Sequence, residues 1–154
     1  MIRGKAEILV TQSILDRLVD TDEWPDTRAE SIAMYRDSIK RDLEWLLNTR
    51  KPVLPILEEF TLARDSVMNF GLPDLHSFDG SAGHEQNALT AALERAIRTY
   101  EPRITNAQVL LSRTDMLSRN LRFHIEGQIL YENMDEEINF DTVLELISGE
   151  YEVK

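Results

Sequence analysis

The spacing of the hydrophobic residues changes partway along this chain, and the change limits the folds that the chain can adopt. Between residues 27 and 100, apolar side chains recur every three or four residues, as on one face of a helix. From residue 121 onward they alternate with polar residues, as in a strand with one buried face. Helices followed by consecutive strands predict an α+β domain. In it, N-terminal helices pack on a small antiparallel β-sheet of three to four strands formed by the C-terminal half.

Two segments show the helical period most clearly. The first begins at Thr27, which has capping-box spacing with Glu30, and it ends before Pro52. The second begins at Glu85 and is ended by Pro102. Their apolar positions are Ile32, Tyr35, Ile39, Leu43, Leu46 and Leu47 in the first helix, and Ala88, Leu89, Ala92, Leu93, Ala96, Ile97 and Tyr100 in the second.

Shorter elements are expected around these helices. Ser13 is a candidate N-cap for a short helix within residues 6–18, whose apolar face could pack on the core or on a partner. Residues 60–70 are predicted to form another helical turn or two, and residues 71–74 to form a stop and a turn. Two glycines within residues 76–84 favour a mobile loop there.

The alternation typical of a strand is cleanest in two segments of the C-terminal half, residues 121–131 and 138–147. We expect residues 134–137 to form the turn between them. Residues 107–111 are a shorter candidate strand. Because consecutive strands usually pair, these segments predict an antiparallel sheet with polar side chains on its second face.

The size and charge of the chain narrow its organisation and its partners. A length of 154 residues fits one core, so we expect residues 1–26 to be an N-terminal helical segment and connector and residues 27–154 a single α+β domain. A net charge of -11 disfavours binding to nucleic acid or to anionic membranes. No segment has the length and hydropathy of a membrane span, and a cytoplasmic location is expected.

The residue types that usually carry chemistry do not form a recognisable site in this sequence. The chain has no cysteine, which excludes thiolate metal sites and cysteine nucleophiles. No carboxylate pair stands out as a glycosidase acid and base, and His76, His84 and His124 lack the close spacing of metal ligands. The glycines around Ser81 match neither a P-loop nor a nucleophile elbow. We therefore predict no catalytic residue, no metal ligand and no cofactor.

One tripeptide, Glu101-Pro102-Arg103, joins the second long helix to the strand region and has two interpretations. In the first, the proline only ends the helix and both charged neighbours are solvated. In the second, Glu101 and Arg103 form a buried or half-buried ion pair at the junction between helix and sheet. Removal of one partner would then leave an uncompensated charge, which is costly.

Several runs of residues, in this order along nearly the whole chain, resemble the TssE family. These proteins are the small baseplate subunits of type VI secretion systems, and they are related to the small wedge protein of contractile phage tails, a family long labelled lysozyme-like. The most specific runs are RDLEWLLNTR within residues 38–50 and NFGLPD within residues 67–74. The full set is SILDRL at 13–18, SIKRDLEWLLNTR at 38–50, VMNFGLPD at 67–74, EPR at 101–103, FDTVL at 140–144 and SG at 148–149.

The resemblance implies a non-catalytic subunit of the baseplate wedge. Such a subunit would sit with TssF and TssG at a baseplate docked on the inner-membrane complex, and it would template the first ring of the TssB–TssC sheath. A partner strand would add to an edge of its sheet through main-chain hydrogen bonds. The positions at which we expect this contact are Asn139, Asp141, Val143 and Glu145.

Two other functions remain open from the sequence. The chain could be the equivalent wedge subunit of a phage tail or tailocin, which neighbouring genes would distinguish. It could also be a peptidoglycan hydrolase, although the carboxylates give that function no support.

Overall fold

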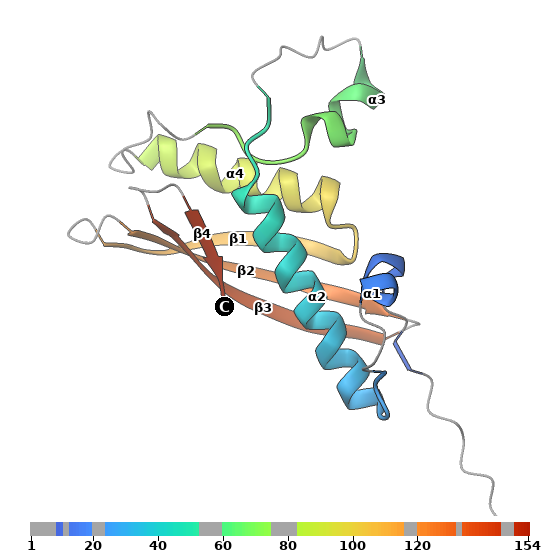
Figure 1. Cartoon of the computed structure of the whole chain (residues 1–154). Helices are drawn as coiled ribbons and strands as arrows, with labels where there is room; N and C mark the ends of the chain where they lie inside the picture. Colours follow the sequence, from blue (N-terminus) through green and yellow to red (C-terminus); the bar gives the residue numbers. More distant parts are fainter. Residues whose placement is uncertain are drawn as a thin grey trace, which may run out of the picture.

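The computed structural model describes residues 9–10, 13–19, 24–52, 60–74, 83–115, 120–131, 134–145 and 150–154. Helices come first and strands afterwards, which confirms the predicted α+β class (Figure 1). The helices are α1 (Ile14–Val19), α2 (Arg28–Asn48), α3 (Thr61–Arg64), the 3-10 helix η1 (Val67–Asn69) and α4 (Gly83–Tyr100). The strands are β1 (Ile104–Asp115), β2 (Asn120–Tyr131), β3 (Met134–Glu145) and β4 (Glu150–Val153).

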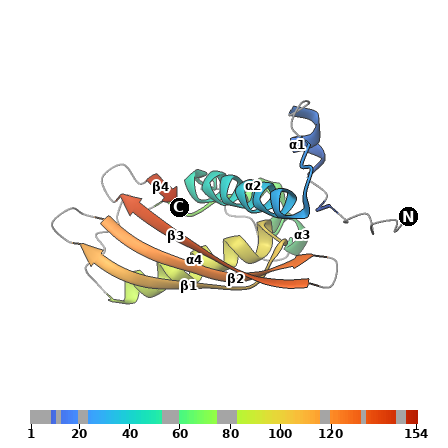
Figure 2. The same ribbon diagram turned by 90° about the horizontal axis from the view of Figure 1, so that it is seen from below.

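The four strands form one antiparallel sheet in the order β1-β2-β3-β4 (Figure 2). β2 and β3 pair without a register shift from Asn120↔Glu145 to Tyr131↔Met134. β4 is short and pairs only with the last four residues of β3, from Thr142↔Val153 to Glu145↔Glu150. Among the described strands, β3 is therefore the one whose outer side is paired over only part of its length.

Both predicted long helices are present, and the first begins at the capping box that its sequence predicts. The Oγ1 atom of Thr27 accepts from the Glu30 amide at 3.2 Å, and the Glu30 carboxylate accepts from the Thr27 amide at 3.2 Å. These bonds satisfy amides that the first turn leaves without helical partners. α2 ends before Pro52, and α4 ends before Pro102, as expected.

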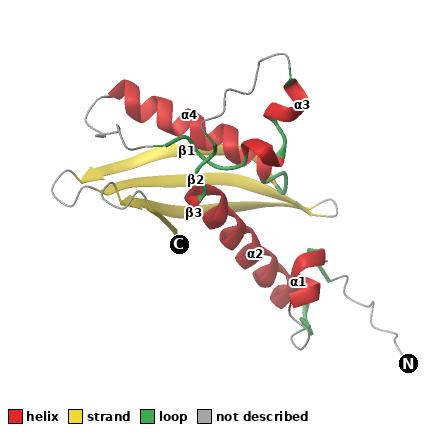
Figure 3. Cartoon of the chain, turned by 45° about the horizontal axis from the view of Figure 1, so that its top comes forward, coloured by secondary structure: helices red, strands yellow, loops and turns green. Residues whose placement is uncertain are grey.

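The hydrophobic core lies between the two long helices and one face of the sheet (Figure 3). α4 packs on β1, α2 packs on β4, and the two helices contact each other. Side chains of β2 alternate as predicted: Leu121, Phe123, Ile125 and Ile129 are buried, whereas Arg122 is exposed. The polar side chains that alternate with them lie on the second face of the sheet.

The segment after η1 contributes to the core as well as making a turn. Leu72 is fully buried and forms a parallel bridge with Arg50. Gly71 has a φ of +104°, and a Cβ at this position would lie 2.4 Å from the carbonyl oxygen of Thr49. Only glycine fits this close approach between the two segments without strain.

Four details differ from the sequence-based expectations. Residues 134–137 are not a turn, because their backbones pair with residues 128–131 and belong to β3. β1 is longer than the predicted 107–111, α4 begins at Gly83 inside the predicted loop, and β4 was not predicted. Residues 76–82 of that loop lie outside the described residues. Residues 134–137 lack the apolar alternation of a strand, but the ladder hydrogen bonds of the backbone do not require it.

Two wider expectations concern the ends of the chain and membranes. The proposed boundary at residue 26 stays a prediction, and Val10, on its N-terminal side, is buried with its amide donating to Ser31 Oγ at 3.1 Å. Across the described ranges, no helix combines the length and apolarity that a membrane crossing requires.

Candidate assembly surface

Glu101 lies between α4 and β1, and its carboxylate forms an ion pair with Arg103. The Glu101 amide still donates to Ile97 at 2.8 Å, so the residue continues the hydrogen bonding of the helix. Only 4% of Glu101 is exposed. Arg103 Nε donates to Oε1 at 2.6 Å and Arg103 Nη2 donates to Oε2. The structure therefore shows the buried ion pair rather than two solvated neighbours, and Pro102 between them is exposed.

Arg103 also reaches α2. Its Nη2 donates to Asp42 Oδ2 at 2.6 Å, and its Nη1 donates to Ser38 Oγ at 3.2 Å. Its guanidinium carbon lies 5.7 Å from the centre of the Tyr35 ring, which is within cation–π distance. One side chain thus links the α4–β1 junction to the middle of α2.

Burial and charge act on Arg103 in opposite directions. Burial alone would lower the pKa of its guanidinium, but the hydrogen bonds and charges of Glu101 and Asp42 outweigh burial and raise that pKa. Arg103 is therefore a permanent cation at this junction, and its charge compensates the buried carboxylate.

A second arginine extends the network from α2 to α1. Arg41 Nη2 lies 3.0 Å from Asp42 Oδ1 and 2.7 Å from Asp16 Oδ1. Its guanidinium carbon lies 5.1 Å from the centre of the Trp45 ring. Acidic and basic groups alternate along this network, which we call the charge chain: Asp16, Arg41, Asp42, Arg103 and Glu101.

Asp16 is the residue that fixes α1 to this charge chain. Its carboxylate accepts from Ser13 Oγ at 2.7 Å, and its amide donates to Ser13 Oγ at 3.1 Å, so Ser13 is the N-cap that the sequence predicts. Burial raises the pKa of Asp16, but the hydrogen bonds from Ser13 and Arg41 and the positive charges lower it below its ordinary value.

The apolar side chains of α1 face away from the rest of the protein. Figure 2 shows α1 beside α2 and away from the sheet. The exposed fractions are 77% for Ile14, 55% for Leu15, 72% for Leu18 and 78% for Val19. A helix that turns its acidic residue inward and its large apolar residues outward offers a surface to a partner.

The sheet offers a second surface along the outer side of β3. The Lys154 amide donates to the Asp141 carbonyl at 2.8 Å, so the backbone groups of Asp141 point to the outer side of β3. Successive residues of an antiparallel strand point to alternate sides, so the other odd-numbered residues of β3 also point outward. Val143 pairs with Glu152 and Glu145 pairs with Glu150, so β4 covers both of these predicted contact positions. Asp141 lies at the end of the covered part. Asn139 alone among the four lies where no described strand pairs with β3 on this side.

Each of the two terminal strands of the sheet has an outer backbone group bonded to the side chain of a helix. β1 has register shifts between Thr105 and Gln108 and between Leu111 and Arg113, and the Val109 amide donates to Glu94 of α4 at 3.0 Å. On β4, Asn48 bonds both backbone groups of Tyr151, at 2.9 and 2.8 Å. Bulges and such side-chain contacts disfavour pairing with another strand at these positions.

The groups that could support chemistry do not converge. His84 is exposed on α4, His76 lies outside the described residues, and His124 contacts Asp141 at 2.9 Å on the polar face of the sheet. Within the described parts of the chain, no three His, Asp or Glu side chains are placed to hold a metal ion. The buried carboxylate of Glu101 is occupied by Arg103.

An outward apolar helix, a partly open strand and a charge chain that joins the helices to the sheet define a structural assembly subunit. Residues 33–134, more than half of the chain, match the family model described as Baseplate wedge protein gp25. The chain therefore belongs to the gp25 baseplate wedge family, which is structural and non-catalytic. That membership confirms the prediction that the chain is not an enzyme.

The chain is also similar to a chain in a solved structure described as "The baseplate complex from the type VI secretion system". The two are 19% identical with a TM-score of 0.47, and the match covers 75% of this chain and 94% of the other. None of the curated proteins compared with this chain matches it.

Proposed function

We propose that this chain is the small wedge subunit of a type VI secretion baseplate, equivalent to TssE, and that it acts in the cytoplasm at a baseplate docked on the inner-membrane complex. In this proposal it binds TssF and TssG and templates the first ring of the TssB–TssC sheath. Membership of the baseplate wedge family supports a role in a baseplate. The order of the sequence runs that resemble TssE favours the secretion system over a phage tail or tailocin.

The observation that carries the binding step is the outward apolar face of α1. Ile14 and Leu18 are 77% and 72% exposed, while Asp16 between them is held to Arg41. Burial of a Leu or Ile side chain contributes about 1.5–3 kcal/mol. The two side chains together can therefore supply a large part of the binding free energy of a subunit contact.

The test is binding of TssF–TssG to the double variant Ile14→Ser with Leu18→Ser. We expect the variant to fold normally, because both side chains are exposed, and its affinity to fall at least about tenfold. Leu110→Ser is the matched control, since Leu110 is 49% exposed on β1, away from α1, and its loss should leave binding unchanged.

Normal binding by the double variant would show that α1 is not the contact. If the unaltered chain binds the wedge proteins of a phage tail and not TssF–TssG, the chain belongs to a tail or tailocin instead.

The templating step is supported by the edges of the sheet. β1 and β4 each have an outer backbone group bonded to a helix side chain, whereas β3 pairs regularly with β2 and has no described partner strand on its outer side over residues 134–140. An added strand needs such a row of unpaired main-chain groups. The template position is therefore the open part of β3, with Asn139 inside it.

A further inference from the structure

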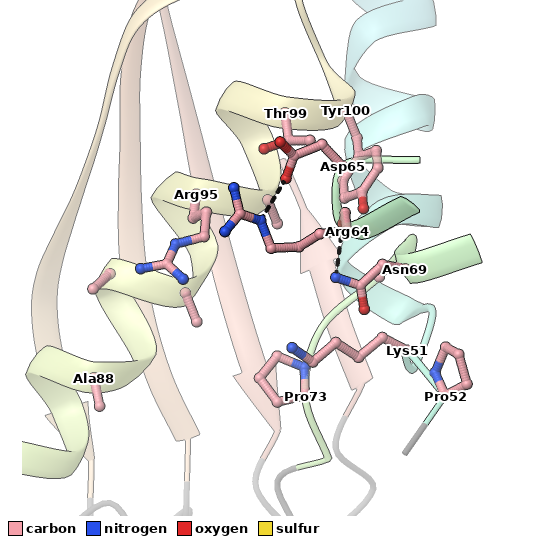
Figure 4. Close-up of a pocket in the computed structure, with 14 residues that line it drawn as sticks. Lys51, Pro52, Arg64, Asp65, Asn69, Pro73, Ala88, Arg95, Thr99 and Tyr100 are labelled. Carbon is pink, nitrogen blue, oxygen red and sulfur yellow. Dashed lines mark hydrogen bonds and ion pairs between the residues drawn. The ribbon is translucent and has the colours of Figure 1, made fainter. Parts of the chain in front are cut away.

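A groove on the side of α4 away from the sheet is a feature that the two assembly surfaces leave unused. It has a volume of about 960 Å³ (Figure 4). Its floor is a row of small side chains on α4, among them Ala88, Ala91 and Ala92. Its opposite wall comes from α3, η1 and the segment around Lys51. A floor of alanines leaves room for the backbone of another chain to approach α4 closely.

The groove is positively charged, although the chain as a whole is acidic. Of the described residues that line it, Lys51, Arg64 and Arg95 are cationic and Asp65 is the single carboxylate, whereas the net charge of the chain is -11. Figure 4 shows the Arg64 side chain extending toward α4, on which Arg95 lies.

Within the part of the chain that the structure describes, these cations have little acidic compensation. Arg64 lies 3.4 Å from Asp65, but their side chains are 52% and 60% exposed, so this pair is weak. The side chains of Lys51 and Arg95 form no ion pair with any described residue. The groove thus has two cations available to carboxylates of another molecule.

The arm that forms the wall of the groove also exposes large apolar residues. Exposed fractions are 89% for Leu62, 83% for Val67 and 65% for Met68. Exposed apolar residues beside a charged groove are typical of a protein interface, because they bury apolar area while the charges set the orientation.

We propose that this groove binds an acidic segment of a protein partner. Small or apolar side chains of the segment lie on the alanine floor, and its carboxylates pair with Lys51 and Arg95. A nucleic acid would need a broad cationic surface, and the strongly negative charge of the whole chain opposes it. This contact is separate from α1 and from the β3 edge, so it adds a third surface to the subunit.

The test places a photocrosslinking amino acid at Ala91, which is exposed on the groove floor, in cells that produce the chain with its natural neighbours. The same amino acid at Gln108, exposed on β1, is the control position. We expect an adduct at Ala91 and not at Gln108, with a crosslinked partner peptide that carries a net negative charge. The charge reversals Lys51→Glu and Arg95→Glu together should lower the adduct yield at least about tenfold.

Other outcomes would overturn the proposal. The proposal fails if Ala91 gives no adduct above the Gln108 control, or if charge reversal leaves the adduct yield unchanged. It also fails if the crosslinked peptide is neutral or basic, or if the adduct forms with nucleic acid or with a second copy of this chain. Circular dichroism of the double variant separates loss of binding from loss of folding. Because the readout does not depend on TssF–TssG, a failure here is distinct from a failure of the proposed baseplate role.

Discussion

At the scale of single residues, Arg103 is the centre of the structure's polar contacts. It lies against Glu101, which is 4% exposed, and against Asp42 of α2 at 2.6 Å. A buried ion pair contributes little net stability when complete, because both charges must leave water. Loss of one partner is different, since the other charge stays buried without compensation.

Replacement of Arg103 by alanine should therefore lower the free energy of unfolding by about 3–5 kcal/mol. Urea denaturation monitored by tryptophan fluorescence measures the change. Arg41→Ala is the control within the same charge chain, because the Arg41 side chain is 38% exposed and its pairs should contribute only about 0–1 kcal/mol. A loss below about 1 kcal/mol for Arg103→Ala would mean that the junction does not depend on this pair.

The sequence predicted only the local half of this network. Glu101 and Arg103 are two residues apart on either side of a proline, so their pairing could be anticipated. Asp42 lies 61 residues before Arg103, and the Asp16 to Arg41 contact joins two separate helices. Spacing carries no information about such pairs, because only the packing of α1 and α4 on α2 brings them together.

At the scale of elements, the described contact that attaches α1 to α2 is made by the carboxylate of Asp16. Its large apolar side chains are exposed, and none of its residues is buried. The contact between Asp16 and Arg41 at 2.7 Å therefore helps to orient this helix. Because the pKa of Asp16 is lowered below 3.8 in the folded protein, the contact stabilises the fold fully above about pH 3.8. The contribution is lost as the pH falls through the lower, folded pKa.

This pH dependence can be measured by comparing the unaltered protein with Asp16→Asn. At neutral pH we expect the variant to be less stable by about 0–1 kcal/mol, a shift of at most a few degrees in Tm. As the pH falls through the lowered pKa of folded Asp16, the two Tm values should converge, because the aspartate is then protonated as well. An equal difference at every pH would show that the contact is not electrostatic.

Elements with a strong period were predictable, and those held by distant contacts were not. The capping box at Thr27 predicted the start of α2, and the alternation in residues 121–131 predicted the bounds of β2 to within one residue. β4 has only four residues, and Asn48 of α2 anchors it by bonding Tyr151. The error at residues 134–137 has the same origin, because their place in β3 depends on the backbone of β2 and not on their own side chains.

At the scale of the whole molecule, the surfaces for partners lie on different parts of the fold. α1 lies beside α2, and the basic groove lies over α4. The open part of β3 is the outer side of this strand where β4 does not pair with it. The first two depend on side chains, whereas the third depends on backbone groups. A substitution that removes one backbone donor should therefore separate sheath templating from binding to the other baseplate subunits.

Asn139→Pro is the variant that makes this separation. The Asn139 amide points away from β2, so proline removes an outer donor and leaves the hydrogen bonds between β2 and β3 in place. We expect a folded protein that still binds TssF–TssG but no longer supports fluorescent sheath in cells. Val143→Pro is the contrasting variant: Val143 pairs with Glu152 of β4, so proline there should destabilise the fold itself. Normal sheath formation by folded Asn139→Pro would exclude the open part of β3 as the template, and the sheath contact would then have to lie on another surface.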